Sequence, residues 1–203
     1  MNTVQHPGRR SVVGMTLAFA CAGPSFAHGG ARNAFAPVLA DPLMSSDQKL
    51  DAVLTLLVRH LRTDRAFIYM RDPDRRMTAY THLATTRPGW GRFALNAWSP
   101  EPNPDTLTEP MLKSAFHSDQ VHYIDDIETA PAGMINRALE RSYFGHRALI
   151  HAPLHQQARF YGILETAMKD TPRIWSPQTR DLIHWLQPQV ARLCSLYLSA
   201  NPT

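Results

Sequence analysis

The stretch that decides the fold is Arg147-Ala-Leu-Ile-His-Ala-Pro-Leu-His155, followed by Tyr161-Gly-Ile-Leu-Glu165 and Ile174-Trp-Ser-Pro-Gln178. The first two parts are apolar runs joined by the polar link Gln156-Gln157-Ala158. This arrangement predicts two antiparallel strands that pair with each other. In the third part, Ser176-Pro177 supplies a hydroxyl cap and then a proline in the first turn, which predicts the start of a helix.

Two long amphipathic helices are expected, one at each end of the folded part. The first begins with a capping box made by Ser45 and Gln48. In the second, Pro188 is expected to bend the helix. Each helix carries an apolar stripe whose residues repeat at three- and four-residue steps. Such a stripe can form the seam of a homodimer, which is our expectation, or cover a sheet within one subunit. The stripes are Leu50, Val53, Leu54, Leu57, Val58 and Leu61, and Ile183, Leu186, Val190, Leu193 and Tyr197.

The segment between these helices begins with a predicted hairpin and continues with a long proline-rich stretch. Loops this long in compact domains usually serve as functional covers or are disordered insertions, and tryptophans argue against disorder. Gly145 is expected to end the last helix of this region. The expected elements are strands at 66–70, 76–85 and 120–125, short helices at 108–116 and 132–143, and an irregular stretch at 86–110.

This order of elements resembles the GAF domain family, which is related to PAS domains. The most specific match is the quoted stretch, in which an apolar strand ending in Pro-Leu, a polar turn, a glycine-centred strand and an aromatic-Ser helix start follow one another. Val121-His-Tyr-Ile-Asp-Asp-Ile127 is similar to the family's middle strand and acidic turn. The resemblance covers 45–200 and implies an α+β fold. In that fold the terminal helices lie on one face of an antiparallel sheet, and loops and short helices cover a pocket on the other.

The amino-terminal residues carry a separate signal. Residues 1–27 have a basic start at Arg9-Arg10, a short apolar run and small residues at Ser25-Phe26-Ala27, which is typical of a signal peptide. The apolar run is too short for a stable membrane span. Alternatively, translation starts at Met44 and the preceding residues are a spurious leader. The protein is exported under the first interpretation and cytoplasmic under the second, and 28–44 is expected to be a disordered linker.

Composition argues against several classes of partner and site. The formal net charge is +4, and three of the basic residues but only one acid precede Met44. The folded part is therefore too close to neutral to suggest nucleic-acid binding. Cys21 and Cys194 lie near opposite ends of the chain, which supports neither a disulfide framework nor a zinc site.

Aromatic residues and histidines are the candidates for a ligand pocket. Trp98 is a prominent candidate, because it lies in the prospective cover rather than in a regular element. Imidazoles in strands can hold a haem or metal or bind an anion, but for each one a structural role is the more frequent case. The candidate ligand-binding residues are Tyr69, Tyr80, Trp90, Trp98, Phe116, His122, Tyr143 and His151.

The sequence lacks the residues that several enzymatic and chromophore-binding functions require. GAF-type methionine sulfoxide reductases need cysteines at the pocket, and bilin-binding GAF domains need a mid-domain cysteine. The domain's one cysteine is Cys194, in the last predicted helix. There is no phosphate-binding glycine loop, nucleophile elbow or recognisable cyclic-nucleotide signature, and no pattern of metal ligands.

We therefore expect a non-catalytic sensory or regulatory module that binds a small ligand and signals through a partner protein in trans. Neither the ligand nor any cofactor is identified by the sequence. The first alternative is a ligand-free dimerisation or interaction scaffold, whose pocket is filled by side chains. The second is a haem- or metal-dependent redox sensor.

Overall fold

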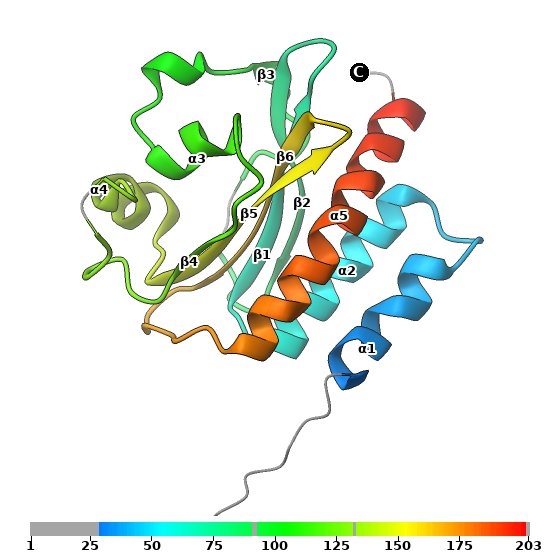
Figure 1. Cartoon of the computed structure of the whole chain (residues 1–203), viewed down its shortest axis with the longest axis horizontal. Coiled ribbons are helices and arrows are strands. Elements are labelled where there is room, and N and C mark those ends of the chain that lie inside the picture. Colours follow the sequence, from blue (N-terminus) through cyan, green and yellow to red (C-terminus); the bar gives the residue numbers. More distant parts are fainter. Residues whose placement is uncertain (1–28, 91–92, 132, 202–203) are drawn as a thin grey trace, which may run out of the picture.

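An antiparallel sheet of six strands forms the middle layer of the molecule (Figure 1). The structure is a computed structural model, which describes residues 29–90, 93–131 and 133–201. The expected leader at 1–27 lies outside the described residues. The strand order is β3-β2-β1-β6-β5-β4. The strands are β1 (Arg65–Asp72), β2 (Met77–Thr85), β3 (Ser99–Pro100), β4 (His122–Ile124), β5 (Ala148–Gln156) and β6 (Arg159–Met168).

Both long helices lie on the same face of the sheet, as the sequence predicts. They are α2 (Ser46–Leu61) and α5 (Pro177–Ala200), which run side by side in Figure 1. The capping box of Ser45 and Gln48 is present, and α5 continues through Pro188. Most of both apolar stripes is buried against the sheet within one subunit, so these side chains do not form an exposed seam.

The expected disordered linker at 28–44 is wrong over most of its length. Residues Gly29–Ala40 form a helix, α1, which lies against α2 and α5 (Figure 1). Phe35 is fully buried in the helical core, and its ring contacts His60 edge-on. Ala31, Val38 and Leu39 also pack against this core, so apolar burial orders a segment whose composition alone suggests a linker.

The other face of the sheet is covered by loops and short helices, again as expected. We refer to the described residues within 86–145 as the cover. Helix formation at 132–143 is shorter than predicted: Asn136 caps a single α-turn, and a π-helical segment then ends at Gly145, which has a φ of 67°. The elements of the cover, besides β3 and β4, are η1 (Pro104–Thr106), α3 (Pro110–Ala115), α4 (Arg137–Leu139) and the π-helix η2 (Glu140–Phe144).

Strand periodicity divides side chains between the two faces. In β1, Ala66, Ile68 and Met70 belong to the core beneath the helices. Their neighbours Phe67 and Tyr69 point to the opposite face, where the cover lies. We call this second side the covered face.

Candidate functional site

A cluster of buried charged and polar side chains occupies the covered face. Arg65 on β1 donates to Nε2 of His146 and, at 3.3 Å, to the carbonyl of Phe144. Nδ1 of His146 lies 2.6 Å from Oε2 of Glu140 on η2. Glu165 on β6 lies beside both histidines of the cluster, with Oε1 3.4 Å from Nε2 of His146 and Oε2 3.0 Å from Nδ1 of His151. We call Arg65, Glu140, His146, His151 and Glu165 the polar cluster.

The tautomer of His146 follows from its partners. A guanidinium can only donate hydrogen bonds, so Nε2 of His146 must accept from Arg65. The ring proton therefore sits on Nδ1, which donates to Glu140. Complete burial lowers the pKa of His146 to about 3, so the ring is neutral at physiological pH.

The carboxyl groups of the site have different environments. Burial, reinforced by Glu165, raises the pKa of Glu140 to about 8. Burial and the nearby Glu140 likewise raise the pKa of Glu109 to about 7. Burial also opposes ionisation of Glu165, but the nearby histidines and Arg65 outweigh it and lower the pKa of this group. One ionised carboxylate and one guanidinium thus lie close together beneath the cover.

Four buried polar atoms on this face have no hydrogen-bond partner among the described residues. They are Nε of Arg65, Nε2 of His122, Nε2 of His151 and Oε1 of Glu165. His122 and His151 are opposite each other in the β4–β5 pairing, with ring centroids 6.3 Å apart. Burying a polar atom without a partner is unfavourable, and folded proteins rarely leave several of them together. In folded proteins, buried polar atoms of this kind usually bond to ordered water or to a bound molecule, so this group makes the covered face the candidate site.

Aromatic side chains surround the guanidinium of Arg65. Its carbon lies 4.1 Å from the ring centroid of Trp90 and 4.9 Å from that of Phe93. Phe93 in turn stacks on Tyr80, with centroids 4.1 Å apart. The indole of Trp90 donates to the carbonyl of Phe144 over 2.8 Å, which connects the two ends of the cover above the cluster.

The sequence candidates are distributed over several environments. Tyr69, Tyr80, His122 and His151 lie on the covered face, and Trp90 lies in the cover above it. Phe116 packs on Phe160 in a small apolar cluster, against which Tyr69 also packs.

Two other candidates lie away from the polar cluster. Trp98 is partly buried against the helical core on the opposite side of the sheet. Tyr143 is 62% exposed and packs edge-on against Phe144. The structure therefore does not bring Trp98 or Tyr143 together with the histidines.

Sequence reasoning did not single out Arg65, Glu140, His146 or Glu165. Arg65 and Glu165 carried a usable signal, since each is a charged residue beside or within the apolar run of its strand. Glu140 and His146 carried none, because their partners are distant in sequence or depend on the π-helical turn.

The described residues contain neither a cluster of metal ligands nor a membrane-spanning helix. No group of three or more His, Cys, Asp or Glu side chains there is arranged to hold a metal ion. No helix in the same residues is long and apolar enough to cross a membrane.

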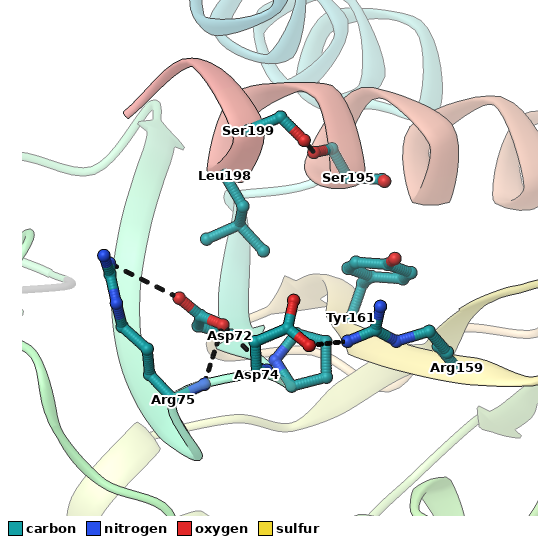
Figure 2. A pocket seen from close by; sticks show the side chains of 9 residues that line it. Asp72, Asp74, Arg75, Arg159, Tyr161, Ser195, Leu198 and Ser199 are labelled. Carbon is teal, nitrogen blue, oxygen red and sulfur yellow. Dashed lines mark hydrogen bonds and ion pairs between the residues drawn. The ribbon is translucent and has the colours of Figure 1, made fainter. Parts of the chain in front are cut away.

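A polar cavity of about 390 Å³ lies between the β1–β2 turn and the carboxyl end of α5 (Figure 2). Its charged groups are paired with one another: Arg159 contacts Asp74, and Asp72 lies 3.7 Å from Arg75. A second cavity, of about 730 Å³, lies among α1, α2 and α5. Neither includes a residue of the polar cluster.

Comparisons with known proteins agree with this architecture. The family model described as GAF domain matches residues 45–198. No curated protein matches the chain significantly. Many solved structures do, at identities low enough that the likeness shows the fold alone.

Two of these structures illustrate the likeness. The phycocyanobilin-bound GAF domain from a cyanobacterial phytochrome is 15% identical, with a TM-score of 0.64, and the match covers 83% of this chain and 96% of that one. The GAF domain from Acinetobacter phosphoenolpyruvate-protein phosphotransferase is 14% identical, with a TM-score of 0.59 and coverages of 84% and 92%. With three-quarters of its length matched by the family model and its sheet and helices arranged as expected, the chain belongs to the GAF domain family.

Proposed function

We propose that this chain is a non-catalytic sensory module that binds a small polar ligand non-covalently at the covered face. The observation that carries the proposal is the group of buried, unpartnered polar atoms on Arg65, His122, His151 and Glu165. A ligand with both hydrogen-bond donors and acceptors satisfies this set, because the guanidinium only donates and the carboxylate only accepts.

Two further observations support a bound molecule at this face. Aromatic rings of Trp90, Phe93 and Tyr80 lie next to the cluster, so polar groups adjoin apolar walls, as in ligand pockets generally. Among the structural neighbours, the phycoerythrobilin-bound domain of a cyanobacterial phytochrome also holds a small molecule in a GAF fold. Cys194 lies fully buried in the helical layer, so it does not suit covalent attachment at the covered face.

A sensory role fits the hydrogen bonding better than catalysis does. The hydrogen bonds of His146 and His151 go to Arg65, Glu140 and Glu165, and no hydroxyl or thiol among the described residues bonds to either ring. We propose that the bound state is read by a partner protein in trans. A homodimer through α2 and α5 remains part of this proposal. It would use their outward side chains, such as the half-exposed Leu196, because the apolar stripes pack on the sheet.

A thermal-shift screen of small polar metabolites tests the binding function. A ligand present at about 100 times its Kd stabilises the fold by about 2.7 kcal/mol, which raises the Tm by roughly 5–10 °C for a domain of this size. His122→Phe removes an unpartnered nitrogen, so it should abolish the shift without lowering the Tm of the free protein. The matched control, His184→Phe on the exposed side of α5, should keep the shift.

The second candidate function is a ligand-free interaction scaffold. The stacking of Phe93 on Tyr80 and the position of Trp90 over Arg65 favour it, since these side chains already occupy space on the covered face. Under this alternative no metabolite shifts the Tm. His122→Phe then leaves complex formation with other proteins unchanged, and that result would displace the sensor proposal.

A further inference from the structure

The cavity of about 730 Å³ on the helical side of the molecule carries an unusual concentration of positive charge. Arg32 of α1, Arg59 and Arg62 at the end of α2, and Arg173 before α5 all line it. Asp181 is the one acidic side chain among its lining residues. We call this site the basic cavity.

The four arginines have no carboxylate partner within the part of the chain that the structure describes. This separates them from Arg71, Arg87 and Arg147, each of which forms an ion pair at 2.6–2.9 Å. Burial and the adjacent charge of Arg62 both lower the pKa of Arg173, so the cavity is short of negative charge. Like charges gathered around a concave surface raise the local concentration of an oppositely charged ligand.

A favourable interaction with a helix end accounts for the position of only some of these arginines. Arg59 is in the last turn of α2, where a cation interacts favourably with the helix dipole. Arg32 and Arg173 come from other segments, and the amino end of the long helix α5, at Gln178, borders the same cavity with its own positive partial charge.

Two of the four guanidinium groups, those of Arg32 and Arg173, make contacts that restrict their positions. Nη1 of Arg173 donates to the carbonyl of Arg62 over 3.1 Å, and its guanidinium carbon lies 5.1 Å from the ring centroid of Trp175. The guanidinium of Arg32 lies 5.7 Å from the ring centroid of Trp185. Guanidinium groups that are already restricted in this way lose less entropy when they bind a ligand.

We infer that the basic cavity binds a small anion with several negative charges, of the phosphate or polyphosphate class. Guanidinium groups match phosphate oxygens in geometry and charge, and the volume suits a small molecule. The site lies on the helical side of the sheet, away from the covered face, so it is independent of the function proposed above.

Isothermal titration calorimetry of the full chain with inorganic pyrophosphate tests this inference. We expect one pyrophosphate per chain and a Kd about tenfold weaker in Arg62→Gly and in Arg173→Gln, the loss of one charge-assisted contact. Arg62 has a left-handed backbone, with a φ of 52°, which glycine adopts without strain. Arg62→Gly therefore removes the charge and keeps the fold, as a Tm measurement will verify. Arg192→Gln, which alters net charge equally at an exposed position outside the cavity, is the control and should leave the Kd unchanged.

Three results would overturn the inference. The first is no heat of binding with pyrophosphate. The second is an equal loss of affinity in Arg192→Gln, which indicates attraction by net charge alone. The third is binding of a poly-glutamate peptide in the absence of pyrophosphate binding, which indicates an acidic protein partner instead. His122→Phe should leave pyrophosphate binding intact, so failure here and failure at the covered face are distinguishable.

Discussion

Replacement of Arg65 by methionine is the sharpest perturbation of the polar cluster. The Arg65 side chain is almost entirely buried, and its guanidinium is the one that donates to His146. Methionine keeps most of the volume but removes the charge and the donor. Glu165 and Glu140, which interact electrostatically with Arg65, then remain buried without that positive charge.

The expected loss of stability is large. Removing one member of a buried charged group costs about 3–5 kcal/mol, because the remaining charge is uncompensated. The whole unfolding free energy of a domain is about 5–15 kcal/mol. Urea denaturation followed by circular dichroism should therefore show a clear drop in midpoint for Arg65→Met. The exposed control Arg192→Met should change stability by less than about 0.5 kcal/mol.

The loss should also depend on pH. The folded-state pKa of Glu140 is raised by burial from 4.5 to about 8, so the folded protein binds more protons than the unfolded chain between these values. Stability from this group is therefore present at low pH and falls as the pH rises through that window. The charge of Arg65 partly offsets the rise in the pKa of Glu140. Without Arg65, stability therefore falls more steeply as the pH rises. We expect Arg65→Met to cost more at pH 9 than at pH 5. A loss below about 1 kcal/mol at both pH values, or one that is independent of pH, would refute the reasoning on the cluster.

Three further predictions concern the fold. Gly162→Ala places a Cβ 2.1 Å from the backbone oxygen of Tyr69, at a φ of 128°. Thermal unfolding should show a loss of at least about 3 kcal/mol in unfolding free energy. Gly30→Ala, which has open space around its Cβ, is the control and should be near neutral. Phe35→Ala should cost about 3 kcal/mol and increase hydrogen exchange in α1; an unchanged Tm would mean that α1 is not docked. Burial raises the pKa of the Cys194 thiol, so in a Cys21→Ser variant it should resist maleimide at pH 8 until urea is added; fast labelling without urea would contradict its place in the core.

The parts of the fold that could be predicted are those with local signals. The two strands quoted at the outset, the capped helix starting after Ser45 and the helix beginning at Pro177 each have a period or a cap that is visible within ten residues. The helix α1 was missed because its order depends on burial of Phe35 against α2, and Pro37 and the surrounding small residues suggest a linker. Tertiary contact overrides local composition here.

The candidate site could be predicted only in part. His122 and His151 were identified because each lies in a recognisable strand, and their pairing follows from sheet register. Arg65 and His146 are 81 positions apart, and their contact depends on how the cover folds back over β1. Trp98 was expected in the pocket because it lies in the prospective cover rather than in a regular element, but the pairing of β3 with β2 places it near the helical core instead. Contacts between distant segments leave no periodic pattern in the sequence.

Native mass spectrometry of the full chain purified from its own host tests the central proposal most directly. If the buried polar atoms on Arg65, His122, His151 and Glu165 hold a ligand, the wild-type protein should carry one discrete extra mass per chain. The same preparation of His122→Phe should lack that mass, and His184→Phe should retain it. A folded wild-type protein with no added mass, or an added mass that persists in His122→Phe, would contradict the account.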